Sequence, residues 1–77
     1  MAKQRFTDTQ EISFLALRES RNISNTGTLT VSVWTGNEYI LTDTLSEGSR
    51  EYFTQGLRLK FEITSGDYYY IERGEQK

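Results

Sequence analysis

The clearest pattern in the chain is a strict alternation of apolar and polar residues from Leu57 to Thr64. The apolar set is Leu57, Leu59, Phe61 and Ile63, and the polar set is Arg58, Lys60, Glu62 and Thr64. Successive side chains of a β-strand point to opposite faces, so this segment is predicted to be a strand with one buried and one solvated face. The short polar loop Ser65-Gly66-Asp67 follows, and it predicts a hairpin in which residues 68–73 return antiparallel.

A second hairpin is predicted from Thr28 to Leu45. Leu29, Val31 and Val33 share one face of its first strand, and Trp34 lies on the other. Gly36 and Asn37 can adopt the positive φ that a tight turn needs, so residues 35–38 are assigned to the turn. The returning strand, residues 39–45, alternates less regularly. Residues 45–56 connect the two hairpins and are expected to hold a short strand around residues 52–54.

The first part of the chain allows two interpretations. Residues 11–19 can form a strand with apolar side chains on both faces, or one or two turns of amphipathic helix, because residues 7–10 resemble a capping box. The strand is favoured because the rest of the chain is β and its edges need partners. Residues 1–10 are predicted to be a flexible arm with Phe6 as its anchor, and residues 21–27 a polar loop. This leaves a single β domain over residues 11–74 and a solvated tail at residues 75–77.

The composition favours an all-β fold. The six glycines recur every 8 to 12 residues, as turns do between short antiparallel strands. The ten threonines and the 13% of aromatic residues suit pleated surfaces. The sequence therefore predicts a small antiparallel β-sandwich or barrel of about six strands.

The chain's size predicts that it works with partners. A domain of 77 residues buries only about 60% of the surface of its unfolded chain, and small domains usually need an added staple. With no cysteine and no histidine, disulfides and the commonest metal ligands are excluded. Homo-oligomerisation or docking on a larger assembly is the source of additional stability that remains.

The same composition argues against an enzyme. Serine and threonine are plentiful, but the usual base that activates a hydroxyl is missing. The acidic residues Asp43, Glu47 and Glu51 do not follow the spacing of a calcium loop, and no phosphate loop is present. We therefore expect no catalytic residue, no cofactor and no metal. The net charge of −2 does not attract polyanions, and no apolar run reaches the ~20 residues of a membrane helix.

The three consecutive tyrosines and the single tryptophan are the candidate contact residues. In a strand, Tyr69 is predicted to face the core with Ile71, while Tyr68 and Tyr70 stand outside as a pair. The outer pair can pack over the stems of Arg58 and Lys60, contact another protein chain, or stack on a sugar or base. Trp34 is either a core or interface residue or an exposed platform for carbohydrate.

The C-terminal half resembles small all-β virion proteins of tailed bacteriophages. The resemblance covers residues 39–74 and rests on five features: a Gly-containing loop, the step Phe53-Thr54 with Gly56, the alternating strand, the Ser65-Gly66-Asp67 turn and the closing Tyr69–Glu72. It implies a non-enzymatic structural protein located in the virion, such as a capsid decoration, head-fibre or tail-joining protein. Such proteins are often trimeric, and their partners are further copies and a capsid or tail.

From the residues and this resemblance together, we expect an interface that includes Phe6, Phe14, Leu15, Leu17, Trp34, Tyr68 and Tyr70. Two alternatives stay open. One is a carbohydrate-binding module that uses Trp34 and the outer tyrosines. The other is a small nucleic-acid-binding barrel, which the acidic balance of the chain disfavours.

Overall fold

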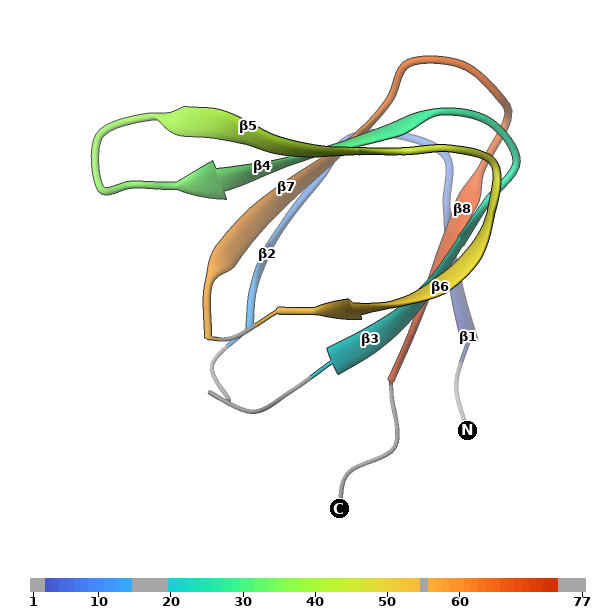
Figure 1. The fold of residues 1–77 in the computed structure, drawn as a ribbon, viewed down its shortest axis with the longest axis horizontal. Coiled ribbons are helices and arrows are strands. Elements are labelled where there is room, and N and C mark those ends of the chain that lie inside the picture. Colours follow the sequence, from blue (N-terminus) through green and yellow to red (C-terminus); the bar gives the residue numbers. More distant parts are fainter. Residues whose placement is uncertain (1–2, 15–19, 55, 74–77) are drawn as a thin grey trace.

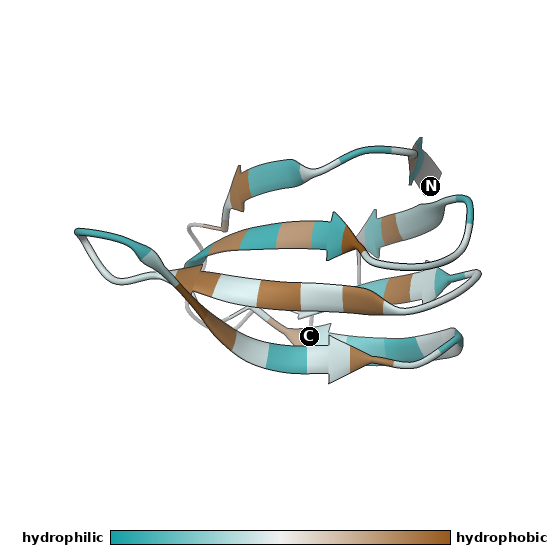
Figure 2. Cartoon of the chain, turned by 90° about the horizontal axis from the view of Figure 1, so that it is seen from above, coloured by the Kyte–Doolittle hydropathy of each residue, from teal (hydrophilic) through white to brown (hydrophobic). Residues whose placement is uncertain are grey.

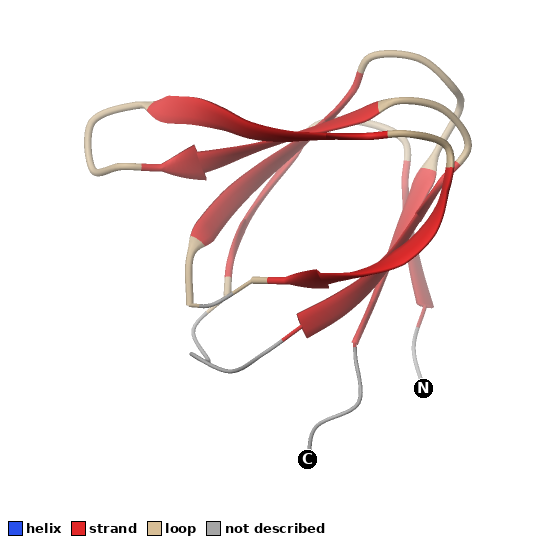
Figure 3. Cartoon of the chain, viewed as in Figure 1, coloured by secondary structure: helices blue, strands red, loops and turns tan. Residues whose placement is uncertain are grey.

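The computed structural model describes residues 3–14, 20–54 and 56–73, which form an all-β protein of two antiparallel sheets (Figure 3). The strands of these residues are β1 (Lys3–Phe6), β2 (Gln10–Ser13), β3 (Ser20–Asn25), β4 (Leu29–Trp34), β5 (Tyr39–Leu45), β6 (Gly48–Phe53), β7 (Arg58–Ile63) and β8 (Tyr69–Arg73). Sheet A has the order β1-β8-β3-β6, and sheet B has the order β2-β7-β4-β5. The fold is a small β-sandwich.

The two sheets are two halves of one folded sheet. Two strands that hold the same place in the order of the two sheets are neighbours in the sequence. These pairs are β1 and β2, β8 and β7, β3 and β4, and β6 and β5. The chain therefore consists of four long arms, each of which runs through both sheets: arm I (β1, β2), arm II (β3, β4), arm III (β5, β6) and arm IV (β7, β8). The arms bend along one line, the crease, formed by residues 7–9, 26–28, 46–47 and 64–68 (Figure 1).

The core lies between the inner faces of the two sheets. Its buried members are Phe14, Ile23, Leu29, Val31, Leu45, Leu59, Phe61, Tyr69 and Ile71. Apolar and polar positions alternate along the central strands, which is how each strand turns one face to this core (Figure 2). The ring centroids of Phe61 in sheet B and Tyr69 in sheet A are 6.3 Å apart, so arm IV contributes an aromatic ring from each side of the crease.

The crease of arms II and IV depends on two glycines in contact. A Cβ on Gly27 would lie 2.3 Å from the Ser65 carbonyl oxygen, and a Cβ on Gly66 would lie 2.6 Å from the Gly27 nitrogen. Gly66 also has a φ of +96°, a conformation that other residues rarely adopt. Only residues without a side chain allow the two central arms to bend at the same level this close together.

Hydrogen bonds hold the crease on both sides of these glycines. The Thr26 hydroxyl accepts from the backbone N–H groups of Asp67, at 2.9 Å, and Tyr68, at 3.2 Å. The Thr28 carbonyl accepts from the Thr64 N–H at 3.0 Å. The regular pairing of strands is interrupted at the bend, and these hydrogen bonds satisfy backbone groups that would otherwise be left unpaired there.

Arms I and III are tied to the central arms in the same region. The buried Asn25 amide donates to the carbonyls of Gly27 and Ser46, and its oxygen accepts from Arg50 Nη1 at 2.8 Å. On the other side, the Tyr69 hydroxyl donates to the Asp8 carbonyl at 2.8 Å. All four arms are therefore connected across one line.

Opposite the crease, hydrogen bonds connect residues at the ends of strands from the two sheets. Phe14 follows β2 in sheet B, Thr54 follows β6 in sheet A, and Leu57 precedes β7 in sheet B. The Phe14 N–H donates to the Leu57 carbonyl at 2.9 Å, and the Leu57 N–H donates to the Thr54 carbonyl at 2.9 Å. Phe14 and Thr54 are buried and close this end of the core.

Several expectations are confirmed. The chain is all-β, and β4 and β5 form the predicted hairpin. Of residues 11–19, for which a strand was favoured over a helix, residues 11–13 belong to the strand β2, and residues 15–19 lie outside the described residues. Tyr69 and Ile71 are buried, as the alternation in the last strand predicts.

Three expectations are wrong. Ser65-Gly66-Asp67 is not a hairpin turn, because β7 and β8 belong to different sheets and the loop is the crease of arm IV. Residues 20–25 are not a loop but β3, a central strand of sheet A whose outward residues are polar. Residues 3–6 are not a free arm but β1, which pairs with β8 in the register Phe6 opposite Tyr69. The last two differences explain why the described residues hold eight strands and not six.

The crease predicts different outcomes for three glycine-to-alanine substitutions. Gly66→Ala adds both a clash and an unfavourable φ, so it should lower the free energy of unfolding by more than about 2 kcal/mol. Gly27→Ala adds only the clash and should be nearly as severe. Gly36→Ala is the matched control: its φ is +109°, but nothing lies within 4 Å of the added Cβ.

We expect Gly36→Ala to lose only about 1 kcal/mol, the penalty of the unfavourable φ. Urea denaturation of the three variants measures these differences. Equal losses for Gly36→Ala and Gly66→Ala would show that close approach at the crease does not matter.

Candidate functional site

The five predicted contact residues that the structure describes do not form one surface. Phe6 is half-buried and packs its ring on Tyr69, with centroids 5.5 Å apart. Phe14 is buried in the core in a T-shaped contact with Phe61, with centroids 6.2 Å apart. Its side chain is thus covered by its own chain. Leu15 and Leu17 lie outside the described residues.

Tyr68 and Tyr70 lie together at the outer side of sheet A. Their rings meet edge to face, with centroids 5.5 Å apart and planes at 76°. The Arg5 guanidinium lies 5.6 Å from the Tyr68 ring centroid. The prediction that they stand outside as a pair is correct. They do not pack over Arg58 and Lys60, because those residues belong to sheet B.

Trp34 lies at the end of the β4–β5 hairpin, in an apolar cluster that we call the hairpin tip: Trp34, Tyr39, Ile40 and Leu41. The rings of Trp34 and Tyr39 have centroids 5.0 Å apart. Trp34, Ile40 and Leu41 are 40%, 49% and 59% exposed. Since Ile40 pairs with Val33 and Leu41 with Ser32, the tip carries apolar side chains on both of its faces.

Charged residues of β2 and β7 lie beside the hairpin tip and are already engaged. Lys60 Nζ lies 4.8 Å from the Tyr39 ring centroid. Arg58 Nε donates to the Tyr39 hydroxyl at 2.9 Å, and Arg58 Nη2 forms a 3.3 Å ion pair with Glu11. This network leaves the polar side of the hairpin tip without strong net charge.

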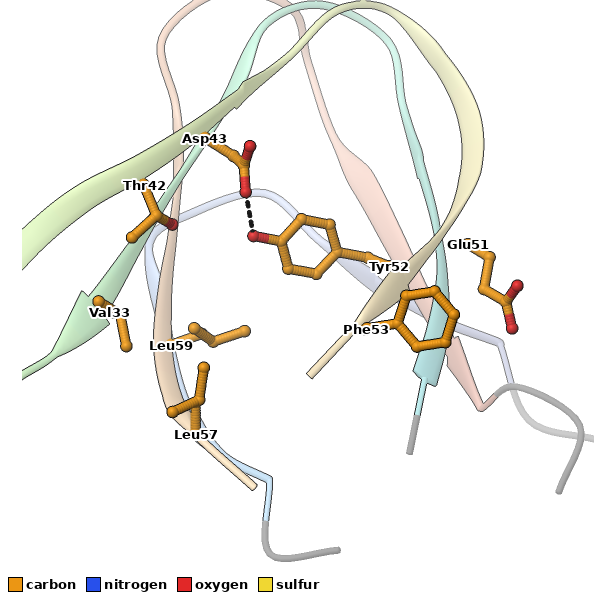
Figure 4. A pocket seen from close by; sticks show the side chains of 8 residues that line it. All are labelled: Val33, Thr42, Asp43, Glu51, Tyr52, Phe53, Leu57 and Leu59. Carbon is orange, nitrogen blue, oxygen red and sulfur yellow. Dashed lines mark hydrogen bonds between the residues drawn. The ribbon is translucent and has the colours of Figure 1, made fainter. Parts of the chain in front are cut away.

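A pocket of about 370 Å³ lies between the two sheets beside arm III, and we call it the arm III pocket. Its lining residues come from β4, β5, β6, β7 and the residue before β7 (Figure 4): Val33, Thr42, Asp43, Glu51, Tyr52, Phe53, Leu57 and Leu59. Phe53 is 62% exposed and Leu57 41% exposed, so both keep much of their apolar surface open.

A β-bulge shapes the polar end of this pocket. Val31 pairs with Asp43 and Ser32 with Leu41, so Thr42 is an extra residue in β5. Asp43 is placed on the inner face, where its carboxylate accepts a hydrogen bond from the Tyr52 hydroxyl. Partial burial, and then this hydrogen bond, raise the pKa of Tyr52 to about 12. Tyr52 therefore stays a neutral donor to Asp43 at physiological pH.

Sequence reasoning missed the arm III pocket and most of the hairpin tip. The signal for the tip was the irregular alternation in residues 39–45, where three apolar residues follow one another. A strand that is apolar on both faces needs cover on both faces. The sequence holds no comparable signal for the contact of Tyr52 with Asp43, because this contact depends on the bulge in β5 and on how the sheet folds over.

The chain matches no protein-family model, no curated protein and no solved structure. Within residues 3–14, 20–54 and 56–73, no group of three or more acidic side chains is placed to hold a metal ion. The same ranges include no helix of the length and apolar character that a membrane span requires.

The pKa of Tyr52 predicts how stability responds to alkali. An unfolded chain ionises this phenol at its ordinary value of about 10, and the folded chain does so at about 12. Neutral Tyr52 therefore stabilises the fold fully below about pH 10, and this contribution disappears as pH rises through 12.

Tyr52→Phe should be less stable than the wild type by about 1 kcal/mol at neutral pH, and this gap should narrow between pH 10 and pH 12. Denaturant titrations at several pH values measure the gap. A gap that stays constant over this range would contradict the assigned contact.

Proposed function

We propose that this chain is a non-enzymatic structural subunit of a homo-oligomer that attaches to a larger protein assembly. Together with the resemblance of residues 39–74, this favours a component of a tailed-bacteriophage virion, of the capsid decoration, head-fibre or tail-joining type. The observation that carries the proposal is the hairpin tip, an apolar surface on both faces of a hairpin that the described residues leave about half exposed.

The hairpin tip has the composition of an interface core. Tryptophan and tyrosine are enriched at the centres of protein interfaces and contribute most of the binding energy there. Each square ångström of apolar surface that a partner removes from water contributes about 25 cal/mol, from which the entropy cost of association is subtracted. Exposed isolated apolar residues are ordinary, but here three exposed apolar side chains and a tyrosine lie within the eight residues 34–41 of one hairpin.

The strand edge suggests how a second copy would bind. β5 is the edge strand of sheet B, so one side of its backbone has no strand partner among the described residues. The bulge at Thr42 interrupts this edge and limits regular pairing to residues 39–41. The contact we propose is therefore mainly side-chain packing around the tip, with at most a short strand pairing.

The two alternative functions have less support. A glycan needs an open aromatic face, but the Trp34 ring is tilted 56° against Tyr39, and Tyr68 and Tyr70 meet edge to face. A nucleic acid needs available cations, but Arg58 is paired with Glu11 and Lys60 lies on Tyr39. Glycan arrays and salt-dependent oligonucleotide binding test these alternatives directly.

The proposal predicts that the chain self-associates through the hairpin tip. Light scattering coupled to size-exclusion chromatography should show an oligomer at micromolar concentration. Leu41→Lys buries a charge in the contact and should weaken association at least about tenfold.

The control is Thr44→Lys, which adds the same charge to an exposed position of the same strand away from the tip. It should leave the oligomer intact. A monomeric wild-type chain, or equal effects of the two substitutions, would refute assembly through the hairpin tip.

A further inference from the structure

We infer that the arm III pocket is a binding site for a protonated amine carried on a small apolar body. This site is separate from the hairpin tip and does not depend on the proposed assembly. Three properties of its lining carry the inference: apolar walls, a polar end made of hydrogen-bond acceptors, and negative charge without a lining cation.

The walls of the pocket can accept an apolar group. Val33, Leu57 and Leu59 form one side, on sheet B and the residue that leads into it, and Phe53 stands at the other side on β6 (Figure 4). A volume of about 370 Å³ falls at the small end of the roughly 300–1,000 Å³ range of ligand pockets. The body of the ligand is thus the size of one aromatic ring or a short alkyl chain.

The polar end offers acceptors, because its hydroxyl protons are already used. The Tyr52 hydroxyl donates to Asp43, and the Thr42 hydroxyl donates to the Val31 carbonyl at 3.1 Å. The Asp43 carboxylate accepts the Tyr52 hydrogen bond, the Glu51 carboxylate accepts one from Ser20 Oγ at 2.7 Å, and each keeps a second oxygen that can accept another. A ligand head that meets these atoms must donate hydrogen bonds, so a carboxylate or phosphate head would be repelled.

The charge of the pocket selects a cation. Asp43 contributes a negative charge at the polar end, Glu51 contributes a second one on the β6 side of the pocket, and the lining residues include no lysine or arginine (Figure 4). The nearby cations have other partners. Arg21 lies 5.2 Å from the Phe14 ring centroid, and Arg50 bonds to Asn25 and to the Ser46 carbonyl. An ammonium head would form charge-assisted hydrogen bonds that a neutral analogue could not form.

This chemistry could come from a free amine or from a lysine side chain of another protein, because both have an apolar stem and an ammonium head. Titration with 2-phenylethylamine and with Nα-acetyl-lysine methylamide separates the sources. Tighter binding of the arylamine indicates a small molecule, and tighter binding of the lysine derivative indicates a protein partner. Saturable binding of either one supports the site.

The test follows the protein's NMR spectrum during titration with these amines at millimolar concentration. We expect saturable shifts at Leu57, Leu59 and Val33, and none with 3-phenylpropionate, which has a similar apolar body and the opposite charge. Absence of saturable shifts with both amines, or equal binding of the anion, would overturn the inference.

Two variants locate the site at Asp43. Asp43→Asn keeps the shape and an acceptor for Tyr52 but removes the charge, so it should weaken amine binding about tenfold. Asp67→Asn removes the same charge at the crease, outside the pocket, and should bind as the wild type does. Glu51→Gln, on the exposed face of β6, tests the second charge in case Asp43→Asn does not fold. Unchanged binding in every folded pocket variant would contradict the assignment.

Discussion

The contact between the backbones of Gly27 and Gly66 is the constraint on which the rest of this structure depends. It lets the two central arms of one antiparallel sheet bend at the same level. Their backbones approach so closely that a Cβ on either residue would clash, so only glycine fits at both positions. A hydrogen bond that the Thr26 hydroxyl accepts from Asp67 N–H, and those that Asn25 and Tyr69 donate, connect the bend across all four arms. Residues 3–14, 20–54 and 56–73 thereby form two layers around a shared core with strands alone, in a sequence that has no cysteine.

Folding one sheet over itself also determines where apolar side chains stay exposed to solvent. The core is closed at the crease, and at the opposite end by Phe14 and Thr54, which are linked by hydrogen bonds to Leu57. Beside arm III the sheets leave the pocket between Tyr52 and Leu59, and the β4–β5 hairpin carries apolar residues beyond the core. The two surfaces proposed for binding are thus consequences of the same architecture, one between the sheets and one at the end of a hairpin.

Local patterns predicted the strands better than their partners. The alternation from Leu57 to Thr64 gave the burial of Leu59 and Phe61, and the tyrosine run correctly separated Tyr69 from Tyr68 and Tyr70. Ser65-Gly66-Asp67 was misinterpreted because a hairpin turn and a sheet crease need the same residues, namely a polar bend with positive φ. Whether a strand returns in the same sheet depends on Gly27, which lies 39 positions earlier in the chain. The burial of Asn25 was not predicted from the sequence. Its amide can be buried because carbonyls of arms II and III accept its hydrogen bonds, and only the folded structure brings those carbonyls to it.

Amide hydrogen exchange tests the central claim most directly. If the crease is the structural centre, the N–H groups of Thr26, Thr64 and Tyr68 should exchange as slowly as those of the core strands, since they open only when the whole fold opens. The turn at residues 35–38 should exchange quickly in the same experiment. Rapid exchange at the crease beside protected strands would mean that the two sheets are held together by the core alone, and the account would be contradicted.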